Sequence, residues 1–170
     1  MYVFLFFYRS RCRNDAEPFL FNIDMPAKTV IFDARVKIIN DFGTNPRNFL
    51  SYNPQGRLLC IAGFGNLAGQ VDVWDRQTLK KVTTIDAPNT VHCEWSPDGR
   101  YLLCATLSPR LRVDNGIKVF HFTGGLMHTD SIEELYQVSS PFLTLSRFRS
   151  NLTFIDFRLH GDLRILVSGP

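Results

Sequence analysis

The chain has 170 residues, of which 45% are hydrophobic, and a formal net charge of +3 at pH 7. Its length suits about one domain with a packed core, and a charge so small and so evenly spread does not by itself require a nucleic-acid partner. The fifteen phenylalanines and three methionines favour β-structure and argue against a helical bundle.

The chain opens on an apolar run from Tyr2 to Tyr8, which is much shorter than the ~20 residues of a membrane-spanning helix. Its positive charges follow the run, whereas a signal peptide carries them before it. We therefore predict that residues 1–17 form an irregular segment, and that the protein is cytoplasmic with no membrane partner.

Residues 18–43 have room for three strands of a sheet that precedes the repeated pattern.

Two copies of one pattern follow, in which NPQGR at 53–57 aligns with SPDGR at 96–100 at an offset of 43 residues. An aromatic residue, Tyr52 or Trp95, precedes each turn, and an apolar run follows it. Proline presets one corner of such a turn, and glycine accepts the left-handed conformation that closes it. Each copy is predicted to form four strands, at 48–52, 58–64, 70–75 and 81–85 and at 91–95, 101–107, 116–122 and 126–128.

Four short strands in a repeat of ~40 to 45 residues, often with Trp-Asp at the end of the third strand, are typical of a β-propeller blade. Trp74-Asp75 supplies that dipeptide. The predicted fold class is all-β, a fragment of a WD40-like β-propeller with about two full four-stranded blades and a partial blade at each end. Trp74 and Trp95 are predicted to pack between blades.

Residues 63–69, GFGNLAG, have the spacing of the dinucleotide-binding fingerprint. That motif holds a pyrophosphate only where a helix begins, but residues 70–75 alternate as a strand does. We interpret the glycines as parts of a loop between two antiparallel strands.

No motif of an enzyme is present, because no serine or cysteine stands in a nucleophile motif beside a histidine. The cysteines form no C-x-x-C pair and no zinc-type cluster, so free buried thiols are favoured over disulfides or metal ligands. They are Cys12, Cys60, Cys93 and Cys104. The prediction is a protein that is not an enzyme, with no catalytic residue, metal or cofactor.

The last part of the chain does not repeat the turn. Residues 134–143 look like the first strand of a further blade and the beginning of a turn. Residues 144–170 are predicted to be a divergent segment with stretches such as Leu152 to Phe157 that pair as strands. This divides the chain into 1–17, 18–143 and 144–170. Propellers close with about four to eight blades, so either the chain is a fragment of a longer product or a partner supplies the remaining blades.

Four stretches carry a resemblance to a known family: MPAKTVIFD at 25–33, FGTNPRN at 42–48, AGFGNLAGQVDVWD at 62–75 and PRLRVDNGIKVFHFTG at 109–124. They closely resemble the eukaryotic translation initiation factor 2A family, and the b subunit of initiation factor 3 is the second choice. The resemblance implies the small ribosomal subunit, initiator methionyl-tRNA and mRNA as partners, with other initiation factors possible. The family's propeller is longer than this chain, and its basic C-terminal extension is absent here.

In a blade, the loop after the second strand and the connection to the next blade emerge on the same face. This places 43–47, 65–69 and 108–115 together. The candidate contacts with RNA or the ribosome are Arg47, Asn66, Arg110, Arg112 and Asn115, since guanidinium and amide groups suit phosphate or an acidic protein. The alternative is a solvated loop, with Arg110 or Arg112 paired to Asp114 or to a carboxylate of a neighbouring blade.

The predicted function is that of a 2A-like translation initiation factor, whose propeller region contributes to binding the small ribosomal subunit and to initiator methionyl-tRNA delivery. Propellers host many unrelated functions. The alternative is therefore a non-enzymatic WD-repeat interaction scaffold, including one like the b subunit of initiation factor 3.

Overall fold

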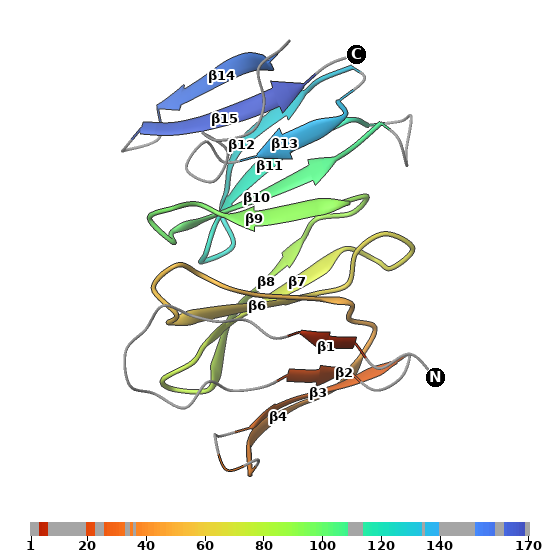
Figure 1. The fold of residues 1–170 in the computed structure, drawn as a ribbon, viewed down its shortest axis with the longest axis vertical. Coiled ribbons are helices and arrows are strands. Elements are labelled where there is room, and N and C mark those ends of the chain that lie inside the picture. The colour runs from red at the N-terminus through yellow and green to blue at the C-terminus, as the bar shows by residue number, and fades with distance from the viewer. Residues whose placement is uncertain are drawn as a thin grey trace.

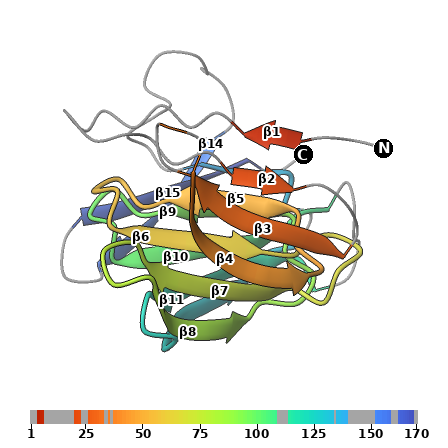
Figure 2. The ribbon, with the colours of Figure 1, turned by 90° about the horizontal axis from the view of Figure 1, so that it is seen from below.

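The computed structural model describes residues 4–6, 20–22, 26–32, 35, 37–108, 114–133, 135–139, 152–158 and 162–168. These residues form four antiparallel sheets, which are stacked along the long axis of the molecule (Figure 1). Viewed along the stack, the sheets lie face to face (Figure 2). The described part of the chain contains no helix that is long and apolar enough to cross a membrane.

The two central sheets are the two predicted full blades. The first contains β5 (Phe49–Tyr52), β6 (Leu58–Ala62), β7 (Gln70–Asp75) and β8 (Lys80–Asp86), and the second contains β9 (His92–Trp95), β10 (Tyr101–Thr106), β11 (Gly116–His121) and β12 (Leu126–Ser131). In each sheet the strands lie in chain order. All eight predicted strands are confirmed, and their ends shift by at most three residues.

A sheet of four strands precedes the full blades. It contains β1 (Phe4–Phe6), β2 (Leu20–Asn22), β3 (Ala27–Phe32) and β4 (Ile38–Asn45), in that order. The last three are the strands expected within 18–43, and β4 runs on to Asn45. The structure differs from the prediction at β1, a strand inside the segment expected to be irregular. The apolar run at the start of the chain pairs with β2, with Phe4 opposite Asn22 and Phe6 opposite Leu20.

The last sheet contains β13 (Gln137–Ser139), β14 (Leu152–Arg158) and β15 (Asp162–Ser168) in the order β13-β15-β14. The expected strand pairing after residue 151 is confirmed by a hairpin that runs from Leu152 opposite Ser168 to Arg158 opposite Asp162. Its order departs from that of the full blades, because β13 pairs with the second strand of the hairpin.

The repeated turn has the expected backbone conformation. Gly56 and Gly99 have φ angles of 70° and 66°, in the left-handed region that glycine accepts. The Gly56 amide donates to the Asn53 carbonyl oxygen at 2.8 Å, and the Gly99 amide donates to that of Ser96 at 2.8 Å. Asn53 Oδ1 also accepts from the backbone amides of Arg57 and Leu58 at 2.9 and 3.0 Å, so these amides inside the turn have a hydrogen-bond acceptor.

The two copies of this turn also bind each other. Gln55 Nε2 donates to the Asp98 carbonyl oxygen at 2.9 Å, and Asn53 Nδ2 donates to that of Gly99 at 3.4 Å. Trp95 Nε1 donates across the same boundary to the Ser51 carbonyl oxygen at 3.3 Å. A motif that closes a hairpin inside one blade therefore also joins that blade to its neighbour.

The main core lies between the two full blades. Trp95 is 6% exposed and packs in this core with residues such as Leu58, Val73 and Leu102, which confirms its predicted place between blades. Trp74 also packs between blades, as predicted, but on the other side of the first full blade, with its ring centroid 4.7 Å from that of Phe42 on β4. Packing of the blades against each other thus buries both faces of the first full blade.

Three of the four cysteines lie in this core as buried free thiols: Cys60, Cys93 and Cys104. The hydrogen bond that Cys104 Sγ donates to Cys93 Sγ, 3.9 Å away, and burial raise the pKa of the Cys104 thiol well above its ordinary value. This thiol is therefore protonated at neutral pH and is a poor nucleophile. Cys12 lies outside the described residues.

We predict that Asn53→Ala lowers the free energy of unfolding by about 1–3 kcal/mol, because it leaves the Arg57 and Leu58 amides without their acceptor. Urea denaturation followed by circular dichroism measures the change. The control is Gln55→Ala, which removes an exposed contact between the turns and is expected to have a smaller effect. Equal effects of the two substitutions would contradict the prediction.

Candidate functional site

The candidate site lies on the face of the blades where the longer loops emerge, which we call the loop face. Its described residues are 44–48, 63–69, 86–91, 107–108, 114–115, 132–133 and 135–136. Two contacts hold the loops of neighbouring blades together. The Gly65 amide donates to the Thr90 carbonyl oxygen at 3.3 Å. A Cβ atom at Gly63 would stand 2.2 Å from the Pro46 carbonyl oxygen, so the chain at Pro46 lies directly against this glycine. The loop face is thus formed by segments distant in sequence.

The glycine-rich segment 63–69 is a loop, as predicted, and β7 follows it at Gln70. Its glycine amides already have acceptors: Gly63 donates to the Gln70 carbonyl oxygen at 3.1 Å, Gly69 donates to that of Gly63 at 2.9 Å, and Gly65 donates to that of Thr90. A phosphate cradle needs such amides to be available to the ligand. No group of three or more His, Cys, Asp or Glu side chains is placed to hold a metal ion within the described ranges.

Arg47 is buried beneath the loop face, with 5% of its surface exposed. Its Nη2 forms an ion pair with Asp72 Oδ2, and its Nη1 donates to the Gln70 carbonyl oxygen at 3.0 Å. The second carboxylate oxygen, Oδ1, accepts from Thr84 Oγ1 at 2.6 Å and lies 3.1 Å from Lys81 Nζ. Both oxygens of the buried Asp72 carboxylate therefore have partners. Without them, burial of this charge would cost a large amount of folding free energy.

This position corrects the expectation that Arg47 presents its guanidinium on an exposed rim. The connection from β4 to β5 directs the side chain inward, where it binds a carboxylate on β7 and fixes the connection to the first full blade. Asp72 stands between Val71 and Val73 in the sequence, and a carboxylate in such an apolar strand requires a cationic partner when buried. An aspartate between two valines of a buried strand is therefore a sequence signal for a buried ion pair, and the prediction for Arg47 did not include it.

The structure describes two of the other four candidate residues, Asn66 and Asn115. Asn66 is exposed on the loop, and Asn115 is half-buried. Asn115 lines a cavity of about 680 Å³ together with residues that include Asp114 and Glu133, and its Oδ1 is buried without a partner among the described residues. Arg110 and Arg112 lie outside the described residues, so their relation to Asp114 stays a prediction.

The described part of the loop face is rich in carboxylates. Asp86, Asp114, Asp130 and Glu133 lie at or beside the strand ends there. Arg47 is the one cationic side chain among the described residues of this face, and it binds Asp72. The described residues therefore do not make this face a basic surface.

Comparison with known proteins identifies the chain. A family model described as "Eukaryotic translation initiation factor eIF2A" matches residues 15–138. The chain belongs to this family. The initiation factor 2A of Schizosaccharomyces pombe is 49% identical over 114 residues, which are 66% of this chain and 20% of that protein. Members of this family are translation initiation factors and not enzymes, as predicted.

Solved structures agree with the family and the fold. A structure titled "Crystal structure of the eukaryotic initiation factor" is 46% identical with a TM-score of 0.68, covering 71% of this chain and 31% of that one. The β-propeller domain of Cps50 (Swd1) from Myceliophteria thermophila, 14% identical with a TM-score of 0.54, covers 72% of this chain and 40% of its own, and supports the propeller fold alone. The WD40-like propeller assignment is thereby confirmed.

The second-choice family is a more distant match. The B subunit of initiation factor 3 from Eremothecium gossypii is 26% identical over 106 residues, covering 51% of this chain and 14% of that protein. The chain spans about a fifth of the length of the curated initiation factors 2A that it matches. The match with the family covers both full blades and most of the sheet before them.

Proposed function

We propose that this part of the initiation factor contributes to binding of the small ribosomal subunit and to delivery of initiator methionyl-tRNA in the cytoplasm. The observation that supports the proposal is family membership across both full blades, at 49% identity to the Schizosaccharomyces pombe factor. The partners would be the small ribosomal subunit, initiator tRNA and mRNA, with other initiation factors as further candidates.

We keep the contact proposed from the sequence, but without Arg47, whose guanidinium binds Asp72. It comprises Asn66, Arg110, Arg112 and Asn115. Arg47 then has a supporting role, because it holds the connection beside Gly63 in place. The amides would bind either phosphate or a protein carbonyl, and the two arginines would supply the charge.

Co-sedimentation of the purified 170-residue chain with purified small ribosomal subunits tests the proposal. The unchanged chain is expected to pellet with the ribosomal particles, and Arg110→Glu combined with Arg112→Glu is expected to weaken that binding about tenfold, since phosphate contacts supply most nucleic-acid affinity. A chain that stays in the supernatant at low salt would contradict binding to the ribosome. A double variant that binds normally would contradict the loop-face contact alone.

A protein-interaction scaffold is the second candidate, and the acidic cavity at Asn115 favours it. Asp114 and Glu133 line this cavity, so a basic segment of a partner protein is the occupant whose charge fits. Asp114→Asn combined with Glu133→Gln separates the two candidates. A scaffold predicts weaker binding to the ribosomal particle in this variant, whereas an RNA contact predicts equal or stronger binding.

A further inference from the structure

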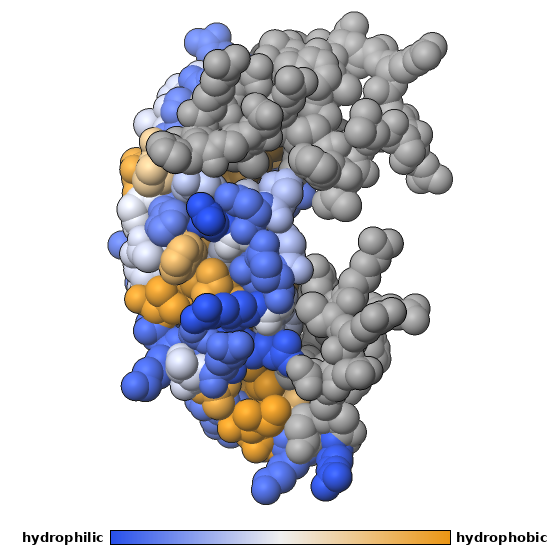
Figure 3. All heavy atoms as spheres, turned by 90° about the vertical axis from the view of Figure 1, so that its left-hand side faces the viewer, coloured by the Kyte–Doolittle hydropathy of each residue, from blue (hydrophilic) through white to orange (hydrophobic). Residues whose placement is uncertain are grey.

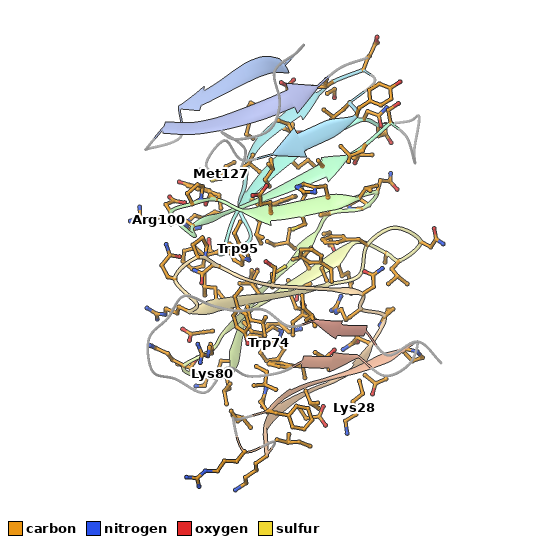
Figure 4. All side chains as sticks on the ribbon, in the orientation of Figure 1. Lys28, Trp74, Lys80, Trp95, Arg100 and Met127 are labelled. Carbon is orange, nitrogen blue, oxygen red and sulfur yellow. The ribbon has the colours of Figure 1, made fainter. Side chains whose placement is uncertain are left out.

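The face opposite the loop face carries the tight turns of the blades, and we call it the turn face: residues 53–57, 76–79, 96–100 and 122–125, together with the described residues Arg35 and Lys37 between β3 and β4. It faces the viewer in Figure 3, where hydrophilic surface crosses its middle. Lys80 and Arg100 lie on this side of the molecule, whereas Lys28 lies on the other side (Figure 4).

Basic side chains dominate the described part of the turn face. Six of them lie in or beside the turns, against two carboxylates, Asp75 and Asp98: they are Arg35, Lys37, Arg57, Arg76, Lys80 and Arg100. All but Arg76 are exposed. The described residues of the two faces thus differ in charge, although the net charge of the whole chain is only +3.

The packing of the turns sets the positions of three of these guanidinium groups. Arg57 and Arg100 occupy the same place in the two copies of the turn, and the hydrogen bond from Gln55 Nε2 to the Asp98 carbonyl oxygen holds the copies side by side. Arg76 Nη1 donates to the Gly56 carbonyl oxygen at 3.4 Å, and its guanidinium lies 6.0 Å from the centre of the Tyr52 ring. The propeller repeat therefore places an arginine in adjacent turns, with a third alongside.

The second full blade leaves its arginine without the partner that the first one has. Arg57 Nη2 lies 3.1 Å from Asp75 Oδ2, and Asp75 stands opposite Leu58 at the end of β7. The equivalent residue in the second blade, opposite Tyr101, is His121. Arg100 therefore has no carboxylate at that place. Its exposed guanidinium and the exposed Lys80 ammonium are available to an external anion.

We propose that the turn face binds the phosphate backbone of RNA without reading its sequence, with Arg100 and Lys80 as principal contacts and Arg57 and Arg76 beside them. The choice of RNA rests on the proposed function, in which the partners are the small ribosomal subunit and tRNA. Arginine forks match phosphate oxygens, and several cations spread over adjacent turns fit a polyanion with regularly spaced charges better than they fit one small anion.

Fluorescence anisotropy with a labelled single-stranded RNA of mixed sequence tests this surface on the 170-residue chain, with circular dichroism to verify folding. Arg100→Glu combined with Lys80→Glu is expected to weaken binding at least about tenfold at low salt and to reduce the slope of log affinity against log salt by about 1.4, or 0.7 for each lost phosphate contact. The matched single control is Lys28→Glu, which makes the same charge change as Arg100→Glu on the other side of the molecule. It is expected to retain most of the affinity.

Equal losses in Arg100→Glu and Lys28→Glu, an unchanged salt slope in the double variant, or no binding of this RNA by the unchanged chain would each overturn the proposal. Co-sedimentation keeps this result separate from the proposed function. If the double variant pellets with small ribosomal subunits as well as the unchanged chain does, the proposed function stands and the turn-face contact is overturned. If the chain binds RNA through the turn face but does not pellet with the ribosomal particle, the turn-face contact stands and the proposed function is overturned.

Discussion

Replacing Arg47 by alanine is expected to lower the free energy of unfolding by about 3–5 kcal/mol, because breaking a buried pair leaves the Asp72 carboxylate uncompensated. Lys81 remains 3.1 Å from Asp72 Oδ1, but its side chain is 45% exposed and compensates only in part. Urea denaturation followed by tryptophan fluorescence measures the loss. The variant also removes the bond to the Gln70 carbonyl oxygen, which ties the connection to β7.

Two comparisons show whether the cost arises from the buried charge. Lys28→Ala removes an exposed ion pair with Asp41 and is expected to change stability very little. Arg47→Met combined with Asp72→Leu removes both charges, and it is expected to be more stable than Arg47→Ala since no carboxylate stays buried alone. If Arg47→Ala is as stable as Lys28→Ala, the buried pair does not support the fold.

Replacing Gly69 by alanine is expected to have the second large effect. Gly69 has a φ of +80°, and a Cβ atom there would stand 2.3 Å from the Ala87 carbonyl oxygen and 2.7 Å from Pro88 Cα. Both neighbours are backbone atoms where the first full blade leads into the second. We expect a loss of about 3 kcal/mol or more, from left-handed strain together with a steric overlap that backbone must relieve.

Gly43 is the matched control for this substitution. It has the same φ of +80°, but a Cβ atom there would have no other atom within 4 Å. Gly43→Ala therefore reports the conformational strain alone, expected to be about 1–2 kcal/mol. The difference between the urea unfolding midpoints of Gly69→Ala and Gly43→Ala then reports the close contact of Gly69 with residues 87–88. Equal losses would mean that residues 87–88 move away without cost, contrary to their close approach to Gly69.

Local sequence signals were sufficient to predict the blades. Turns with proline and glycine at 53–57 and 96–100, each followed by a continuous apolar run, specify a hairpin through contacts between residues close in the chain. The 43-residue offset then identifies the repeat, and all eight strands of the full blades follow from it. Stretches specific to one family supplied its identity, again without any long-range information.

Other features depended on residues distant in sequence, which no local pattern specifies. The strand at Phe4–Phe6 exists through its pairing with Leu20–Asn22, and β13 selects β15 over the nearer β14. In the same way, Arg47 looks like a surface loop residue until the blade packing brings Asp72, 25 positions further on, against its guanidinium.

The distribution of charge between the two faces was likewise decided by the tertiary structure. The sequence determined which residues are basic and that they are spread along the chain. The blades then direct each tight turn toward one face and each long loop toward the other, so that Arg57 and Arg100 lie in adjacent turns although they are 43 positions apart. Electrostatic potential depends on distances in space, and the fold of the repeat sets those distances.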